Sequence, residues 1–481
     1  MSIWQTVISN LPEVEGPSQK ILSFREKLKW TGIVLVIFFV LGLMPLFGLG
    51  INALQRFETL SIILGAEFGS LISLGIGPIV TASIVLQLLN GSGIWKFDLT
   101  TPEGKKTFQG TQKFLALFFI LFESAIYVFL GGLAPAEQFK GTGFYFQLQL
   151  ILIFQLFLGG LLILFLDEVV SKWGFGSGIS LFIAAGVSKS LFIQAFNWLP
   201  GPSGLAGVTY SSGAVPAFFQ SMVNGDVTTA LIMISAVLFT ILVFVIAVYA
   251  QAMKVEIPLS FGMVRGHGIR WPLSFIYTSN IPVILVAALI ANLQLWARLL
   301  QGKVEGATGG VIHWLSLHIF GQFAGNVPVS GLVKWAYSPN LLVEVFSAIQ
   351  SGVFNWISLV QALTFALLMM GGAVVFSIFW VQTAGMDARS QAKQIMNSGL
   401  QIPGFRRDER VLESILKRYI FPLTVMGGLT VGFLAASADV VGALTSGTGI
   451  LLTVMIIYRL YEEIAQQHMM DMYPALRKMM V

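Results

Sequence analysis

The chain has 481 residues, of which 56% are hydrophobic and only 11% are charged. A soluble domain carries about a quarter charged residues, so this composition excludes an ordinary water-exposed globule and indicates a protein surrounded largely by lipid. The sequence contains no cysteine, which excludes disulfides, thiolate metal sites and cysteine nucleophiles. The net charge of +5 is informative mainly through the places where the charges lie.

The N-terminal segment, residues 1–30, is polar and lacks an apolar core followed by a small-residue cleavage site, so no cleavable signal is predicted. Residues 18–30 mix apolar side chains with basic ones, a pattern typical of an amphipathic helix on the membrane surface. We therefore expect a cytosolic amphipathic segment here, and a solvated tail is the alternative.

Ten apolar stretches follow, each near the roughly 20 residues that a membrane-spanning helix needs. They cover residues 31–49, 73–90, 113–133, 146–167, 177–197, 228–250, 281–299, 357–381, 419–437 and 443–462. The second is short and interrupted by glycine, and the ninth also looks broken by glycines. Residues 309–320 are apolar but too short to cross, which predicts an interfacial or re-entrant piece. The sequence thus predicts an all-α, polytopic membrane protein.

Lysine and arginine predict which side each loop faces, because short cytosolic loops carry an excess of them. An even number of spans puts both termini on one side, and that side holds most of the basic residues. The opposite side holds only Arg56, Lys140, Arg298, Lys303 and Lys334. We expect a multi-pass protein of the cell membrane with both termini in the cytosol.

The ten spans divide into five plus five, and an odd number per half makes the second half inverted relative to the first. No strong internal sequence repeat is visible, so the inversion is a geometric possibility at this point. The predicted organisation places spans one to six in 31–250 with the halves dividing near 200–227, spans seven and eight in 281–381, and spans nine and ten in 419–462. Cytosolic loops occupy 251–280 and 382–418, and a cytosolic tail occupies 463–481.

Residues for catalysis or cofactor binding are scarce. His267, His313, His318 and His468 are not paired at metal-ligand spacing, and there is no GxxxxGK[ST] loop for nucleotide phosphates. We therefore predict no metal, no cofactor and no catalytic site. Among the few ionisable groups within spans, Glu123 stands alone near the middle, which is weak support for an ion-coupled transporter.

The segment after the first span is unusual. Residues 51–74 are semi-apolar and compatible with a helix, yet they carry Arg56, Glu58 and Glu67 and are too polar to span. Backbone of this kind is tolerated at membrane depth only where it is buried in protein or lines a cavity. An external loop is the alternative.

Branched aliphatic residues recur at one-face helical spacing in three places: Ile76 with Val80, Ile179 with Ile183, and Ile281 with Ile284. Each pair adjoins glycine or proline. Such stripes usually face lipid or a protein core, so the spacing alone does not establish a pore.

Two long cytosolic loops are strongly basic. One spans residues 254–275 and the other spans residues 385–419. Their charge suits a polyanionic partner, because each phosphate that is neutralised releases counterions. Topology signals and contact with lipid headgroups are the alternative explanation.

Several segments, in order, resemble the SecY family of protein-translocase channels. They are GIGPIVTASIVLQLL, WGFGSGISLFIAAGV, VRGHGIRWPLSFIYTSNIPVILVAALIANLQLW, PGFRRDER and GTGILLTVMIIYRLYEE. The resemblance covers about the whole chain, the motifs are jointly very specific, and the loops look closest to the archaeal branch. A secondary transporter for a small solute is the runner-up, and a non-transporting membrane scaffold is a third possibility.

The resemblance implies an hourglass channel of two inverted five-helix halves, with a plug helix within about residues 54–65. It implies that the channel moves unfolded polypeptides across the membrane and releases hydrophobic segments sideways into lipid. It implies a pore ring at Ile76, Val80, Ile179, Ile183, Ile284 and Leu452, with Ile281 beside it. A lateral gate between spans two and three and spans seven and eight would have polar positions at Thr81, Glu123 and Asn292.

The same resemblance implies that Arg265, Arg270, Arg406 and Arg407 in the basic loops dock the ribosome. The expected partners are small subunits of the SecE type and the SecG/beta type, the ribosome, nascent or unfolded secretory polypeptides with their signal sequences, and membrane lipids. No enzyme activity is expected of such a channel.

Overall fold

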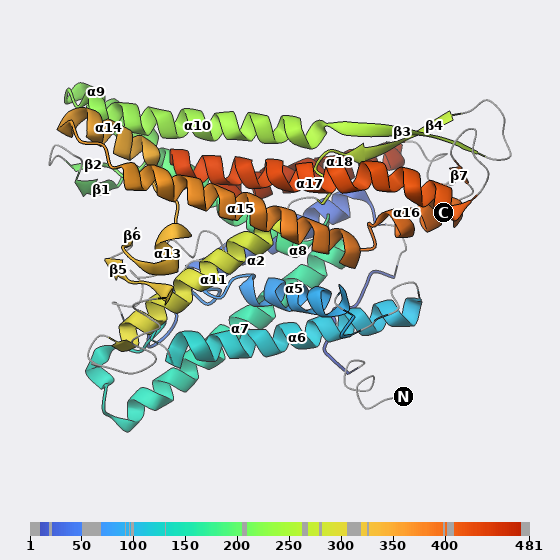
Figure 1. The fold of residues 1–481 in the computed structure, drawn as a ribbon. Coiled ribbons are helices and arrows are strands. Elements are labelled where there is room, and N and C mark those ends of the chain that lie inside the picture. The colour runs from blue at the N-terminus through green and yellow to red at the C-terminus, as the bar shows by residue number, and fades with distance from the viewer. Residues whose placement is uncertain are drawn as a thin grey trace.

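The computed structural model describes residues 10–18, 22–50, 69–91, 93–95, 97, 101–129, 131–203, 209–261, 268–278, 281–304, 319–324, 327–397, 400–401 and 408–472. The described part is mainly helical (Figure 1). Each of the ten predicted stretches coincides with a helix: α2 (Phe24–Leu43), α5 (Gly77–Gly91), α6 (Pro102–Phe129), α7 (Gly143–Trp173), α8 (Gly178–Phe196), α10 (Val227–Ala252), α11 (Ile281–Val304), α15 (Trp356–Thr383), α17 (Glu409–Val441) and α18 (Gly447–Met472).

Shorter elements connect these helices. The short helices are η1 (Glu137–Phe139), α9 (Ala214–Val223), α13 (Gly331–Trp335), α14 (Leu341–Ser351) and α16 (Ala388–Asn397). The strands are β1 (Pro200–Ser203), β2 (Thr209–Ser211), β3 (Lys254–Phe261), β4 (Gly268–Ser274), β5 (Phe323–Ala324), β6 (Val327–Pro328) and β7 (Leu400–Gln401). The expected piece at 309–320 falls almost entirely outside the described residues.

Within the described residues, seven helices are long and apolar enough to cross a membrane, namely α6, α7, α8, α10, α11, α15 and α17. The expectation of a helical, multi-pass membrane protein is confirmed at this level. The other three long helices, α2, α5 and α18, do not meet this criterion of length and composition. Helix α5 has only 15 residues. Helix α2 begins, and helix α18 ends, with several charged residues that shorten the apolar run.

The first span begins earlier and ends earlier than the sequence indicated. Helix α2 starts at Phe24, where the Ser23 hydroxyl accepts a hydrogen bond from the backbone N–H of Glu26 at 3.4 Å. Residues 24–30, which we expected in a separate surface helix, are therefore the first turns of α2 and continuous with the apolar stretch that follows. Helix α2 ends at Leu43 because Met44 is extended ahead of Pro45, as residues before proline usually are.

The ninth predicted span is one unbroken helix, so the expected glycine break is wrong. Helix α17 runs through Gly428 and Gly432, and both glycines pack against α15. A Cβ atom on Gly428 would lie 2.7 Å from the Ser377 hydroxyl oxygen, and one on Gly432 would lie 2.8 Å from Cα of Met370. The glycines allow two helices to approach closely, as small residues commonly do in membranes.

The helices form two hydrophobic cores. One core consists mainly of residues from α2, α5, α6, α7 and α8. The other consists mainly of residues from α10, α11, α15, α17 and α18. Between the two groups, α18 contacts α8 and α2, and α5 contacts α15. Each five-helix group therefore has its own core, and the groups meet along a seam.

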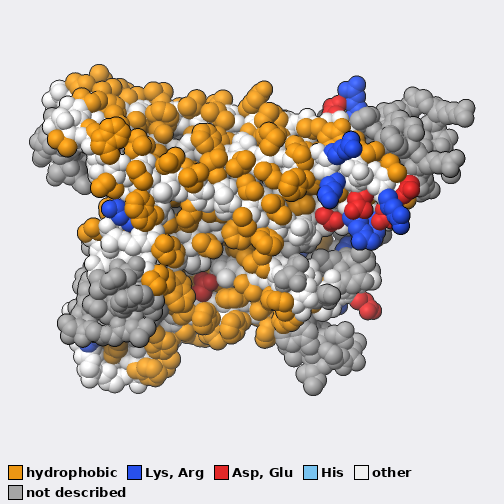
Figure 2. All heavy atoms as spheres, in the orientation of Figure 1, with side chains coloured by type: hydrophobic (Ala, Val, Ile, Leu, Met, Phe, Trp, Pro, Cys, Tyr) orange, Lys and Arg blue, Asp and Glu red, His pale blue; other side chains and the backbone are white. Residues whose placement is uncertain are grey.

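Strands β3, β4 and β7 form one antiparallel sheet with β3 in the middle. We call this end of the molecule the sheet end and the opposite end, with α9 and α14, the far end (Figure 1). Hydrophobic side chains cover the face along α10 and α15, whereas charged side chains gather at the sheet end (Figure 2). The backbone N–H of Val14 donates to Glu168 near the end of α7, and Lys27 near the start of α2 donates to Gln467 near the end of α18.

Candidate functional site

Six of the seven aliphatic residues singled out in the sequence, here called the aliphatic cluster, lie near the second helix group and belong to the core of the first. Ile76, Ile183 and Leu452 are buried in it, and Val80, Ile179 and Ile284 pack against it. They come from the turn before α5, from α5, and from α8, α11 and α18. Helices of both groups thus converge on one apolar constriction. The seventh residue, Ile281, is partly buried at the start of α11 and is not part of this cluster.

The turn that carries Ile76 depends on a glycine. Gly75 has φ of +56°, a conformation that side chains other than glycine rarely adopt. Helix α5 starts directly after this turn, at Gly77. The chain therefore reverses immediately before the helix that carries Val80 and Thr81, and the short span begins later than the sequence indicated.

A small cavity of about 70 Å³ adjoins the constriction. Ile76, Val80, Ile183, Ile284 and Leu452 line it, and so do the three polar residues Thr81, Glu123 and Asn292. The side chains of Thr81 and Glu123 face the cavity from two helices that pack against each other, α5 and α6. Asn292 faces the cavity from α11, on the other side of the seam, and it is exposed. The structure thus brings five of the predicted ring residues and the three predicted gate residues to one cavity.

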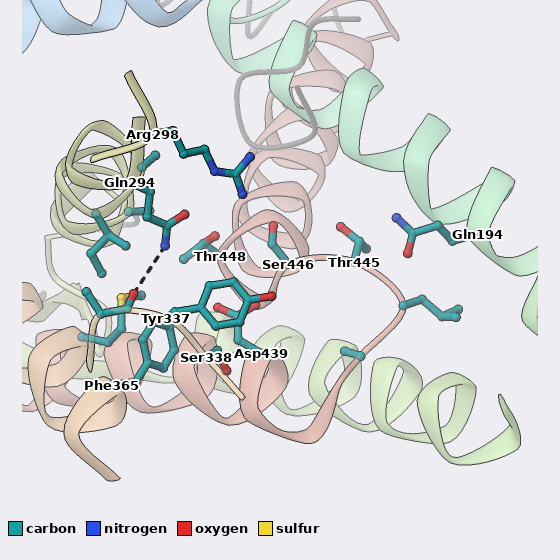
Figure 3. A pocket seen from close by; sticks show the side chains of 17 residues that line it. Gln194, Gln294, Arg298, Tyr337, Ser338, Phe365, Asp439, Thr445, Ser446 and Thr448 are labelled. Atoms are coloured by element: carbon teal, nitrogen blue, oxygen red, sulfur yellow. Dashed lines mark hydrogen bonds between the residues drawn. The ribbon is translucent and has the colours of Figure 1, made fainter. Parts of the chain in front are cut away.

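A larger polar chamber of about 380 Å³ lies toward the far end. It shares Ala287, Ala291, Ser446 and Thr448 with the small cavity, so the two are neighbours along one path. Figure 3 shows Gln294 and Arg298 entering it from α11 and Gln194 from α8, with Asp439 and Thr445 between them. No sequence motif predicts this chamber, because its lining comes from positions that are far apart in the chain.

Two of the polar side chains in the chamber wall contact neighbouring segments of the chain, and a third is buried without a partner in the described part of the chain. The side-chain nitrogen of Gln294 donates to the Ala336 carbonyl oxygen at 3.5 Å. The Arg298 guanidinium lies over the Phe323 ring at 4.6 Å from the centroid. The Thr445 hydroxyl is buried and has no hydrogen-bond partner among the described residues. The polar side chains of this chamber can bind water, whereas the aliphatic side chains next to it offer water no hydrogen-bond partner.

The basic loops are joined by the sheet at the sheet end. Strands β3 and β4 form a regular hairpin from Lys254 paired with Ser274 to Ser260 paired with Gly268. Strand β7 adds Gln401 opposite Ser260, so a residue from the second loop pairs directly with the first. The two basic loops therefore share one support.

One predicted docking residue lies within the described part. Arg270, on β4, is exposed and pairs with Glu256 on β3 at 3.0 Å. Nearby, the Tyr277 hydroxyl donates to the Met386 carbonyl oxygen at 2.7 Å, which ties the hairpin to the start of the second loop. Burial raises the pKa of Tyr277 to about 12, so this hydroxyl stays a donor at neutral pH. Arg265, Arg406, Arg407 and the expected plug at 54–65 lie outside the described residues.

The described part of the chain contains no cluster of three histidine, cysteine, aspartate or glutamate side chains that could hold a metal ion. His468, the described histidine, lies at 5.6 Å from the Phe24 ring in an edge contact. Its position at the contact between α18 and α2 points to a packing role.

Comparison with known proteins places these features in a family. The SecY family model matches residues 70–461. A protein translocase subunit SecY from Methanothermobacter thermautotrophicus is 43% identical over 482 residues, which cover 98% of this chain and 97% of the relative. The subunit of that name from Pyrococcus furiosus is 42% identical, with 97% and 96% covered.

Solved structures agree with the sequence relatives. One described as "The structure of a protein conducting channel" is 40% identical, with a TM-score of 0.77 and 98% of both chains covered. Another is Sec61 in a canine ribosome–channel complex from the endoplasmic reticulum, at 39% identity, a TM-score of 0.75 and 98% of both chains covered.

Proposed function

Because this chain belongs to the SecY family, we propose that it forms the protein-conducting channel of a translocon. The channel moves unfolded polypeptides across the membrane and releases hydrophobic segments sideways into lipid. The observation that carries this proposal is the small cavity at the seam, which aliphatic side chains from both helix groups line. The family membership agrees with the archaeal-type SecY resemblance of the sequence.

The aliphatic cluster acts as the pore ring. A constriction of apolar side chains gates by excluding water, so ions do not cross it. Such side chains make no strong hydrogen bond or ion pair with a passing polypeptide, so they do not discriminate among sequences. The ring consists of Ile76, Val80, Ile179, Ile183, Ile284 and Leu452, with Ile281 on its border. The plug lies within about residues 54–65. No catalytic group takes part in this function, and no cofactor is required.

The ten long helices act as ten spans in two inverted halves, α2 to α8 and α10 to α18, with the division near residues 200–227. The lateral gate runs between the pair α5 and α6 and the pair α11 and α15. Contact between α5 and α15 supports this seam, as does the cavity lined by Thr81, Glu123 and Asn292. A hydrophobic segment inside the pore can partition into lipid through it, because about 20 apolar residues favour the bilayer.

The sheet end faces the cytosol, together with both termini. The excess of basic residues supports this orientation. Arg270 on the sheet docks the ribosome together with Arg265, Arg406 and Arg407 of the two basic loops, and small subunits of the SecE and SecG/beta types complete the complex. Sec61 in complex with the ribosome supports this docking mode by its similarity to the chain.

Single-channel conductance of the reconstituted complex tests the ring. Replacing Ile183 or Ile284 with asparagine inserts a hydrated amide into the constriction, so the resting channel becomes permeable to ions. Replacing the exposed Ile349 on α14 with asparagine is the control and leaves conductance unchanged. Wild-type conductance in both ring variants would remove the ring from the proposal.

A further inference from the structure

At two joints of the fold, an aspartate in one long helix lies beside the first turn of the next. At the joint of α7 and α8, Asp167 accepts a hydrogen bond from the backbone N–H of Ile179 at 2.9 Å. At the joint of α17 and α18, Asp439 accepts one from the backbone N–H of Gly447 at 2.6 Å. Both aspartates are half-buried. Each satisfies an N–H that has no partner within its helix, where the helix dipole favours negative charge.

The two joints share their local sequence as well. Ser177 and Gly178 open α8, and Ser446 and Gly447 open α18. A Cβ atom on Gly178 would lie 2.5 Å from Cα of Asp167. One on Gly447 would lie 2.1 Å from the Ala435 carbonyl oxygen. Glycine is required at both positions because the preceding helix passes so close to the helix start.

The joints occupy equivalent places in the two helix groups, since each connects the last two long helices of its group. They lie at opposite ends of the molecule. Phe175, just before α8, contacts Lys27 at the sheet end, whereas α18 starts at the far end and returns to the sheet end at Gln467. The same aspartate-capped joint therefore occurs in both helix groups, at opposite ends of the molecule. This is the relation expected of two inverted halves, for which the sequence shows no strong internal repeat.

Both capped helices carry residues of the aliphatic constriction close to the capped end. Ile179 and Ile183 lie in the first two turns of α8, and Leu452 lies in the second turn of α18. A helix end that is held by hydrogen bonds fixes the depth and rotation of the turns that follow it. Asp439 and Ser446 also line the polar chamber next to the constriction.

We infer that Asp167 and Asp439 are positioning residues that hold α8 and α18, from opposite ends, at the depth where their aliphatic side chains close the channel. This inference rests on the proposed function, because it takes the constriction as the seal. The aspartates act through the two helices and do not touch the translocating chain in this role.

Resting ion conductance of the reconstituted complex tests this role. We expect Asp167→Ala and Asp439→Ala to raise the conductance about fivefold, the shift in a two-state ratio that loss of one helix cap produces. Asn keeps a side-chain oxygen that can accept the same hydrogen bond, so Asp167→Asn and Asp439→Asn retain most of the seal. The melting temperature of each variant is measured alongside.

Asp226→Ala is the matched control for loss of a cap. Asp226 caps α10 by accepting from the backbone N–H of Thr229 at 3.1 Å, and α10 carries no residue of the constriction. It should lower the melting temperature without raising conductance. If Asp226→Ala leaks as much as Asp439→Ala, general loosening explains the effect and the inference is wrong.

Two further sets of variants are needed, one in case an alanine variant does not fold and one to distinguish failure of this inference from failure of the proposed ring. If an alanine variant does not fold, Gly178→Ala and Gly447→Ala replace it, because a Cβ there pushes the helix start away from its support, and a leak is again expected. Ile284→Asn serves as the reference for the ring. If Ile284→Asn leaks but the joint variants do not, the inference fails and the proposed function stands; if Ile284→Asn does not leak, the proposed ring itself fails.

Discussion

The polar residues beside the constriction are divided by the seam. Thr81 and Glu123 both belong to the same side, on α5 and α6. Asn292 lies on the other side, on α11. Between them the cavity is lined mainly by apolar side chains, so the seam at this level is closed mainly by apolar contacts.

This arrangement predicts the direction of a change at Asn292. Leucine in its place adds apolar contact to a cavity already lined by Ile76, Val80 and Leu452, which stabilises the closed seam by about 1 kcal/mol. A signal sequence must then be more hydrophobic to open it. Translocation or insertion of a graded series of signals measures the threshold, and Asn292→Gln, which keeps the amide, should leave it near the wild-type value. A threshold that does not move in Asn292→Leu would make Asn292 a packing residue only.

The long elements could be predicted from apolar run length, but their ends and contacts could not. Residues 419–437 were recognised as a span, yet the glycines within it were taken for a break. A pair of glycines looks the same in sequence whether it interrupts a helix or lets a neighbour approach. Only the position of α15, set by residues elsewhere in the chain, decides between the two. The start of α2 was misplaced for a related reason, since Ser23 caps one continuous helix that contains both the basic residues and the apolar stretch after them.

The close approach of α15 and α17 predicts unequal effects of two similar substitutions. Gly432→Ala places a Cβ atom 2.8 Å from Cα of Met370, and overpacking of this kind costs about 1–3 kcal/mol. Gly371→Ala, on α15, meets no atom within 4 Å and should be neutral or slightly stabilising, because alanine favours a helix over glycine. Thermal unfolding of both variants in detergent measures the difference. Equal melting temperatures would show that the two helices separate at little cost.

At the scale of the whole molecule, the sequence located most of the candidate site through local motifs. Five of the aliphatic residues stood out by their helical spacing, whereas Leu452 and the three polar residues were implied by the resemblance to the SecY family. Eight of these nine residues line one cavity. The polar chamber with Gln194, Arg298 and Asp439 was missed, because its residues share no motif. The sheet that joins the two basic loops was also missed. Its pairing of Ser260 with Gln401 connects distant parts of the chain, and β7 is too short to leave a sequence pattern.

The shared sheet predicts that the two basic loops act as one docking surface. Arg270 lies on the β3–β4 hairpin, and four residues separate β7 from Arg406 and Arg407 in the chain. Arginine suits ribosomal RNA because its planar guanidinium donates two hydrogen bonds to one phosphate. Reversing Arg406 and Arg407 to glutamate should weaken ribosome binding, with the largest difference at low salt, where counterion release contributes most. Cosedimentation of the purified complex with ribosomes over a salt series measures this.

A charge reversal at the other end of the molecule provides the matched control. Lys334→Glu on α13 changes the net charge in the same direction but lies at the far end, so binding should be unaffected. Membrane orientation should survive the Arg406→Glu and Arg407→Glu changes, because Arg389, Lys393 and Arg410 keep the loop positive. If the two loops form one docking surface, Arg270→Glu should weaken ribosome binding as well. The variant with all three arginines reversed should then lose less binding free energy than the sum of the separate losses, because all three residues contribute to one surface. Equal binding by wild type and variants at every salt concentration would assign these arginines to topology or to lipid headgroups.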